Sequence, residues 1–265
     1  MGNRSRVLTA TFALVLAGAG ALAGPTAASA PDPSRGSVSI QAPAAALVGE
    51  PIVFKGRVSL RRSGLKVGLQ RKVGSGWKNI SRTATKAGGR YRLTGSVTLG
   101  GDYKFRVIRL PWLTTSAKSR VVTVSAYAWN PVNTLLQDGD HTGLTEIDVP
   151  LEIDGTTYPR SFGIDADSQG EPDGGFFEVD LEGLGCAVFE TTLGGLDANA
   201  ATSEVGGRVL VDGEQVAGDS YSPGESEYVA LDVRGVDRVR VEGFVAKEGP
   251  EGSLGVGTPR LLCTG

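Results

Sequence analysis

The chain has 265 residues, of which 40% are hydrophobic and 21% charged, with 39 Gly, 13 Pro, two Cys and a single His. This composition suits one or two globular domains and excludes a disordered or collagen-like chain. One His and two distant Cys are too few ligands for a His-rich, His₃ or Cys₄ metal site, so the composition argues against a zinc enzyme.

The formal net charge of -2 conceals two halves of opposite charge. Residues 31–125 hold 18 basic and 3 acidic side chains (+15), whereas residues 126–265 hold 7 basic and 26 acidic ones (-19). This asymmetry favours two separate domains that meet near residue 125.

Residues 1–30 have the order of a secretory signal peptide. Arg4 and Arg6 precede an apolar run from Val7 to about Ala23, and small residues continue to Ala30. The run is at the lower limit of length for crossing a bilayer, and no second apolar stretch follows it. We therefore expect a protein without a membrane span that is secreted and is extracellular or associated with the cell surface.

Residues 31–125 consist of short alternating segments between turn residues. They predict an all-β sandwich with strands near 38–40, 53–58, 67–73, 91–97, 103–108 and 121–124. The region resembles the immunoglobulin-like spacer modules of secreted bacterial proteins. The resemblance rests on the order of Val67-Gly68-Leu69-Gln70-Arg71-Lys72, Gly76-Trp77, Gly88-Gly89-Arg90-Tyr91 and Gly101-Asp102-Tyr103-Lys104-Phe105-Arg106-Val107.

Basic side chains in this first half occupy alternate strand positions, as Lys104 and Arg106 do between apolar neighbours. One face of the sheet should therefore be solvated and cationic. Two interpretations stay open: the charges keep the face soluble and protect edge strands, or they bind anionic cell-envelope polymers. Nucleic acid is not an expected partner, because the aromatic residues fall at core positions and an exported chain rarely meets it.

Residues 126–265 also predict strands, near 151–153, 161–164, 176–181, 186–192, 208–211, 228–233 and 236–245. Dipeptides such as Asp154-Gly155 and Asp212-Gly213 supply the positive φ angles that hairpins need. A second β-sandwich is the economical fold, which makes the whole chain all-β with two β-sandwich domains at 31–125 and 126–265.

The order of segments in the second half is more distinctive than the alternation. It is similar to the NPCBM family, carbohydrate-binding jelly rolls that are appended to secreted glycoside hydrolases. The similarity rests on Pro150-Leu151, Ile153-Asp154-Gly155-Thr156-Thr157-Tyr158, Ser161-Phe162-Gly163-Ile164-Asp165-Ala166, Phe177-Glu178-Val179-Asp180-Leu181, Gly185-Cys186-Ala187-Val188-Phe189, Gly194-Gly195-Leu196-Asp197, Gly207-Arg208-Val209-Leu210-Val211-Asp212-Gly213 and Leu231-Asp232-Val233-Arg234-Gly235-Val236. The resemblance implies a jelly roll that binds glycans, with terminal galactose or N-acetylhexosamine as suitable sugars.

Family members commonly carry a Gly-x-His-Ala-like turn where this sequence has Asp165 in place of the His. We expect Asp165 and Asp167 to accept hydrogen bonds from vicinal hydroxyls, with Tyr158, Trp129 or Tyr221 as a platform for the sugar ring. The alternative is a module that contacts protein: a structural adhesion protein, whose basic domain holds anionic envelope polymers while its acidic domain meets a protein partner.

Acidic loops raise structural calcium as a cofactor, and no other cofactor is expected. Oxygen ligands are offered by Asp165-x-Asp167-x-Gln169-Gly170 and by Asp138-Gly139-Asp140. The first loop has Phe176 where an EF-hand has its bidentate Glu, and solvated acidic loops explain both segments as well.

Cys186 and Cys263 are the only cysteines. Export places them in an oxidising compartment, so we expect a structural disulfide that links the last strand to an inner one; two free thiols are the poorer alternative.

Catalytic signals are weak. The sequence has no Gly-x-Ser-x-Gly motif, and His141 beside Asp138 and Asp140 is best interpreted as a solvated loop residue. The stretch Gly252-Ser253-Leu254-Gly255-Val256-Gly257 imitates a dinucleotide loop but predicts only a surface turn before the last strand. We expect a binding protein and no enzyme; a small glycosidase, which needs only two carboxylates, is the weakest alternative.

Overall fold

The computed structural model describes residues 36–110, 117–137, 139–166, 174–246 and 252–265, and the expected signal peptide lies outside them. Helical structure in these ranges is limited to two 3-10 turns, η1 (Ala87–Gly89) and η2 (Val132–Thr134). None of the helices in the same ranges is long and apolar enough to cross a membrane. The chain is all-β, as the sequence predicts.

The strands fall into two groups that follow one another along the chain. The first group comprises β1 (Ala45–Leu47), β2 (Ile52–Arg57), β3 (Lys66–Val73), β4 (Gly76–Ala84), β5 (Arg90–Gly95), β6 (Gly101–Arg109) and β7 (Val122–Pro131). The second group comprises β8 (His141–Thr142), β9 (Leu144–Ile153), β10 (Thr156–Asp165), β11 (Phe176–Asp180), β12 (Cys186–Gly195), β13 (Val205–Val211), β14 (Glu214–Tyr221), β15 (Ser226–Asp232), β16 (Arg238–Val245) and β17 (Ser253–Cys263).

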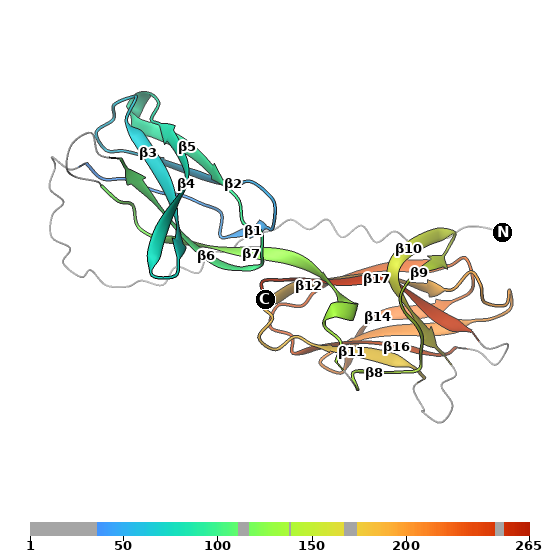
Figure 1. Ribbon diagram of the computed structural model, residues 1–265. Coiled ribbons are helices and arrows are strands. Elements are labelled where there is room, and N and C mark those ends of the chain that lie inside the picture. Colours follow the sequence, from blue (N-terminus) through green and yellow to red (C-terminus); the bar gives the residue numbers. More distant parts are fainter. Residues whose placement is uncertain (1–35, 111–116, 138, 167–173, 247–251) are drawn as a thin grey trace.

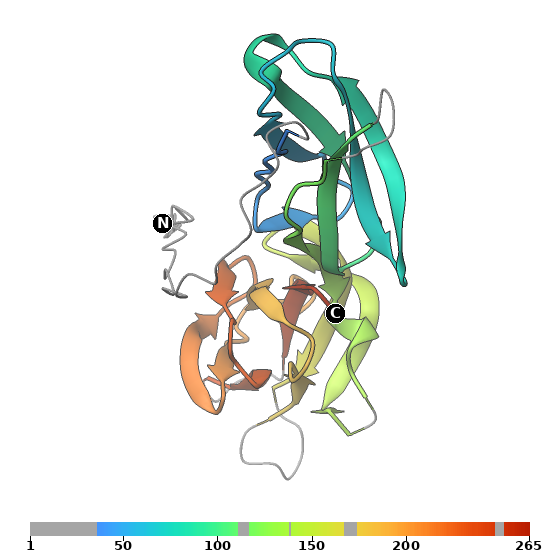
Figure 2. The same ribbon diagram turned by 90° about the vertical axis from the view of Figure 1, so that its left-hand side faces the viewer.

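Strand β7 belongs to both groups. One sheet runs through the molecule in the order β15-β12-β17-β7-β6-β3-β4, with β1 beside β7, and with β10 and then β9 beside β17. Residues 122–126 of β7 pair with β6, and residues 128–131 pair with the C-terminal part of β17. Figure 1 shows β7 leading from the first lobe into the second, and the view in Figure 2 shows the same succession. The expected boundary at 125/126 falls inside this strand.

Each half encloses its own apolar core. In the first half, the two-stranded sheet β2-β5 faces the large sheet, and Phe54 and Phe105 meet between them with ring centroids 4.8 Å apart. In the second half, the sheet β14-β13-β16-β11-β8 faces the β12 and β17 region, with Phe162 and Phe177 in the core at 5.1 Å. Alternation builds both cores: in β5, for example, Tyr91 and Leu93 point inward between exposed arginines.

The last strand departs from the sequence expectation. The glycine-rich stretch 252–257 was expected as a surface turn, which is wrong, because Ser253–Gly257 lie inside β17 and pair with β10 and β12. Glycine is needed there for a steric reason. A Cβ on Gly255 or Gly257 would lie 2.7–2.8 Å from side chains of the β9–β10 hairpin or of Leu196, so only a bare backbone lets these groups pack on β17.

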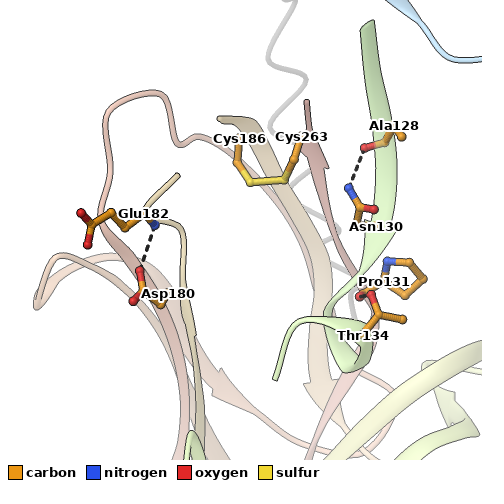
Figure 3. The surroundings of a disulfide bond; sticks show 8 residues. All are labelled: Ala128, Asn130, Pro131, Thr134, Asp180, Glu182, Cys186 and Cys263. Carbon is orange, nitrogen blue, oxygen red and sulfur yellow. Dashed lines mark hydrogen bonds between the residues drawn. A yellow bond between two sulfur atoms is a disulfide. The ribbon is translucent and has the colours of Figure 1, made fainter. Parts of the chain in front are cut away.

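The two cysteines form the disulfide that the sequence predicts. Cys186 in β12 and Cys263 in β17 are direct partners in the strand register, and both side chains are buried. Figure 3 shows the bond between the two strands, with Ala128 and Asn130 of β7 on the neighbouring strand. The disulfide thus fastens the last strand to an inner strand at the end of the sheet that adjoins the first half.

Breaking this bond should destabilise the second half. The cysteines are 77 residues apart, and in the chain-entropy treatment a loop of this length contributes up to about 4.5 kcal/mol. We predict a lower free energy of unfolding for the double variant Cys186→Ser/Cys263→Ser, measured by denaturant titration, and the same loss on reduction of the wild-type protein. Peptide mapping of the secreted protein should show the linked pair; two free thiols would contradict this account.

Candidate functional site

Asp165 ends strand β10 at the edge of the second half. Its backbone is held on both sides, since its N–H donates to the Gly143 carbonyl at 2.8 Å and its carbonyl accepts the N–H of Gly175 at 3.0 Å. In the strand register it lies opposite Ser253 of β17. The residue is half-buried between the buried Ile164 and Ala166, so its backbone is fixed where the chain leaves the sheet. Asp167, the second acceptor expected from the sequence, lies outside the described residues.

Tyr158 lies nearer the start of β10, where the strand bends over the sheet. Its ring rests on the backbone of Gly257, because a Cβ there would come within 2.8 Å of the ring, and it packs beside the small cluster around Ile153. The bend is fixed by Ser161, whose hydroxyl donates to the Tyr158 carbonyl at 2.8 Å and accepts the Thr258 N–H at 3.2 Å. The ring is therefore half-buried and rigidly placed.

Trp129 lies on β7 at the other end of β17. It is 37% exposed, and the guanidinium of Arg260 lies 4.4 Å from the ring centroid. In the strand register Trp129 is the partner of Leu262, while Arg260 is the partner of Pro131. This ring thus belongs to the outer surface of the large sheet.

Tyr221 faces the core and not the solvent. The residue is 4% exposed, and its hydroxyl donates to Oε2 of Glu227 at 2.9 Å. Burial, followed by the hydrogen bond and the negative charge of Glu227, raises the pKa of this phenol well above its ordinary value. Its ring offers no stacking surface to a sugar.

Strand β17 places the expected site residues at separate points. Asp165 lies beside Ser253, Tyr158 lies over Gly257, and Trp129 lies next to Arg260. Positions 253 and 260 are seven residues apart, or roughly 20 Å along an extended strand. Asp165 thus lies at the Ser253 end of the strand, Tyr158 lies four residues further along over Gly257, Trp129 occupies the other end, and Tyr221 lies in the core between the sheets.

Three residues that were not predicted from the sequence lie on the same outer face as Trp129, namely Arg260, Glu190 and Tyr228, and Arg260 contacts the Trp129 ring. Glu190 of β12 is paired with Arg260 and accepts a hydrogen bond from the Tyr228 hydroxyl at 2.9 Å. The alternation of apolar residues along 186–192 and 228–233 is the sequence signal that could have placed Glu190 and Tyr228 on an outward face. Which strands are neighbours, however, is decided by pairings between segments far apart in sequence.

Within the parts of the chain that the structure describes, no group of three or more His, Cys, Asp or Glu side chains is arranged to hold a metal ion. Asp138, Asp167, Gln169 and Gly170 of the expected calcium loops lie outside those parts. Asp140 caps its own turn, with its carboxylate accepting the Gln137 N–H at 2.8 Å. Structural calcium therefore stays a prediction.

A groove of about 560 Å³ opens on the second, five-stranded sheet. Carboxylates and two arginines line it, namely Glu178, Asp180, Glu182, Asp212, Asp237, Arg238 and Arg240. Several of these carboxylates are used locally: one oxygen of Asp212 accepts the N–H groups of Asp237 and Arg238, and Asp180 accepts that of Glu182. The groove is therefore lined in part by carboxylates whose oxygens already accept backbone N–H groups of neighbouring turns.

The fold and these surfaces define a class of protein. It is built of β-sandwiches, and it carries aromatic and carboxylate side chains on an outer sheet face and at the ends of strands. Residues 110–253 match the family described as NPCBM/NEW2 domain. The match spans more than half of the chain, and the chain belongs to this family. A search of curated proteins found no match.

Solved structures similar to the chain include carbohydrate-binding modules from Clostridium perfringens. The CBM51-2 and INT domains of ZmpB are 17% identical with a TM-score of 0.40, over 62% of this chain and 38% of that one. The CBM51 of GH95 in complex with methyl-galactose is 19% identical with a TM-score of 0.41, over 50% of this chain and 99% of that one. The M60 catalytic domain of ZmpB with CBM51-1 and CBM51-2 is 13% identical with a TM-score of 0.43, over 88% of this chain and 32% of that one. The chain thus spans well under two thirds of both ZmpB structures.

The buried position of Tyr221 gives a prediction. Replacing Tyr221 by Phe removes the hydrogen bond to Glu227 and should lower the free energy of unfolding by about 1 kcal/mol without changing glycan binding. The difference from wild type should shrink as the pH rises above about 10, because the unfolded phenol then ionises while the buried one keeps its proton. Denaturant titrations across this pH range measure the effect; a difference that grows with pH would contradict the assignment.

Proposed function

We propose that the protein is a secreted, non-catalytic carbohydrate-binding protein that recognises glycans at or outside the cell surface. Its membership of the NPCBM/NEW2 family across residues 110–253 is the observation that carries the proposal. The disulfide between Cys186 and Cys263 supports an oxidising, extracellular location, as does the signal peptide expected at residues 1–30. In this proposal residues 126–265 form a jelly-roll binding domain, and residues 31–125 form an immunoglobulin-like spacer before it.

The first binding site in this proposal is the end of β10. Asp165 has a fixed backbone and a carboxylate that can accept hydrogen bonds from two neighbouring sugar hydroxyls. Tyr158, nearer the start of the same strand and four β17 positions away over Gly257, supplies a rigid apolar surface that flanks this end. A single terminal sugar of the galactose or N-acetylhexosamine type, with Asp167 as a further acceptor, is the ligand proposed for this site.

The proposal is tested by replacing Asp165 with Ala. Loss of a charged acceptor should weaken binding of the methyl glycoside of galactose or N-acetylgalactosamine by roughly 1.5 to 3 kcal/mol, or about 10- to 150-fold. Little apolar area is removed, so any change in melting temperature should be the same in calcium and in chelator. Titration calorimetry measures the affinity, with Asp237→Ala, directly before β16 of the opposite sheet, as a control for the loss of a carboxylate elsewhere on the second half.

The same variant separates sugar binding from calcium binding. If Asp165 holds calcium, Asp165→Ala lowers the melting temperature in calcium and removes any difference between calcium and chelator. An Asp165→Ala protein that matches wild type in sugar affinity and in both melting temperatures would remove this site from the account.

A second candidate function rests on the first half. The outer face of β3, β4 and β6 carries Trp77 with the Arg106 guanidinium 4.0 Å and the Lys72 ammonium 5.6 Å from its ring centroid. Arg106 also donates to the Gln70 side chain at 2.8 Å, and burial lowers the pKa of its guanidinium, which stays charged at neutral pH. A cationic face of this kind suits adhesion to anionic envelope polymers, with the acidic half in contact with a protein partner.

This second function predicts salt-sensitive binding. Polygalacturonate and heparin, used as anionic probes, should bind the wild-type chain at low ionic strength and be released as the salt rises to about 0.5 M, since screening then acts within a few ångströms. The variant Lys72→Gln/Arg106→Gln should weaken this binding. Retention of both probes at high salt, or equal binding by the variant, would count against adhesion through this face.

A further inference from the structure

The outer face of the large sheet in the second half carries a row of four side chains on four neighbouring strands. The strand order is β7, β17, β12 and β15, and the side chains are Trp129, Arg260, Glu190 and Tyr228 in the same order. Arg260 and Glu190 are direct partners in the strand register. We call these four residues the outer row.

Each member of the outer row is held by the next. The Arg260 guanidinium stacks on the Trp129 ring at 4.4 Å and forms an ion pair with Glu190. The Tyr228 hydroxyl donates to the other oxygen of Glu190 at 2.9 Å. Because each polar group is already oriented by a neighbour, the row would lose little conformational freedom on binding a ligand.

The two ends of the outer row are open to solvent and its centre is partly covered. Tyr228 is 64% and Trp129 37% exposed, whereas the side chain of Glu190 is 14% exposed. The two ends of the row therefore offer aromatic surface to a ligand on either side of polar groups.

The opposite, five-stranded sheet holds a similar Arg–Glu ion pair without a Trp or Tyr beside it among the described residues. There Glu242 is 5% exposed and paired with Arg208 and Arg240, and these arginines stack on Phe244 and Phe176. The same combination of contacts is thus built with two half-buried phenylalanines. The outer row instead ends in a Trp and a Tyr, which combine an apolar ring with a hydrogen-bonding group.

The chemistry of the outer row selects a neutral ligand. Arg260 is neutralised by Glu190, so the row offers no net charge to an anionic polymer. Exposed rings offer flat apolar surfaces to the C–H face of a pyranose, and the polar atoms between them offer donors and acceptors to its hydroxyls. Three strand spacings separate β7 from β15, roughly 14 Å, which is longer than a single sugar ring.

We propose that the outer row is a second glycan site, distinct from the end of β10, and that it binds a linear neutral oligosaccharide of at least three sugars laid across the strands. The inference rests on the proposed glycan-binding function and extends it from a terminal sugar to a chain. Asp165 is the register partner of Ser253 and Trp129 that of Leu262, nine residues or roughly 30 Å apart along β17, so one long glycan or two separate ones can occupy both surfaces.

The test is the dependence of affinity on chain length in the full protein. Calorimetric titrations use cello-oligosaccharides and chito-oligosaccharides from the disaccharide to the hexasaccharide. For at least one series, affinity should rise at least about tenfold between the disaccharide and the tetrasaccharide and change little with salt. Trp129→Ala and Tyr228→Ala should each abolish that gain, and Tyr228→Phe, which keeps the ring, should lose only part of it.

Matched variants make the outcome specific. Phe244→Ala removes an arginine-stacked ring from the opposite sheet and should leave the gain intact, while Asp165→Ala should weaken binding of single sugars and leave the gain intact. Circular dichroism melting checks that each variant is folded. The inference is overturned if neither series binds more tightly with length, or if Trp129→Ala and Tyr228→Ala affect the gain no more than Phe244→Ala does; single-sugar binding lost only in Asp165→Ala would then leave the first site standing.

Discussion

Strand β17 is the element on which the rest of the second half depends. Its inward side chains, including Leu254, Val256 and Leu261, form the core, while Gly255 and Gly257 leave bare backbone on the outer side. The β9–β10 hairpin closes over that backbone, and β17 also pairs with β12 and with the end of β7. The disulfide at Cys263 fastens the strand to β12. One strand therefore fixes the hairpin, the ion pair of Arg260 and the link to the first half.

This arrangement explains why the functional surfaces lie at the two ends of one strand. At the Ser253 end, β10 finishes beside β17 and presents Asp165 from a backbone held by two hydrogen bonds. At the Cys263 end, Arg260 reaches the outer face and orders Trp129 and Glu190 around it. Both surfaces rest on paired strands, which hold side chains more firmly than loops do. A glycan-binding protein needs such rigidity, because its ligand gains affinity from many weak contacts that must be in place at once.

Much of the fold could be predicted from the sequence, because alternation and turn dipeptides are local signals. The strands near 53–58, 67–73, 103–108 and 186–192 were found in this way, and oxidising export was enough to predict the disulfide. The glycine-rich start of β17 was missed because its strand conformation is imposed by packing of Tyr158 and Leu196, which overrides a low β propensity. The site was harder still. Tyr221 stands between two serines and Tyr228 between Glu227 and Val229, yet one ring turns into the core and the other lies on the surface, and the pairing of distant strands decides which.

The central claim is that glycans bind on the second half along β17, at Asp165 and at the outer row. The chain has three tryptophans, Trp77, Trp112 and Trp129, so their indole N–H signals form a small set of resolved probes in a nuclear magnetic resonance titration. With a neutral tetrasaccharide from the series that binds, the Trp129 indole signal should shift, and with the methyl glycoside of galactose or N-acetylgalactosamine the Asp165 backbone amide should shift. The Trp77 indole signal should stay in place with both ligands. Shifts confined to Trp77, or the absence of any shift at Trp129 and Asp165 at saturating sugar, would contradict the account.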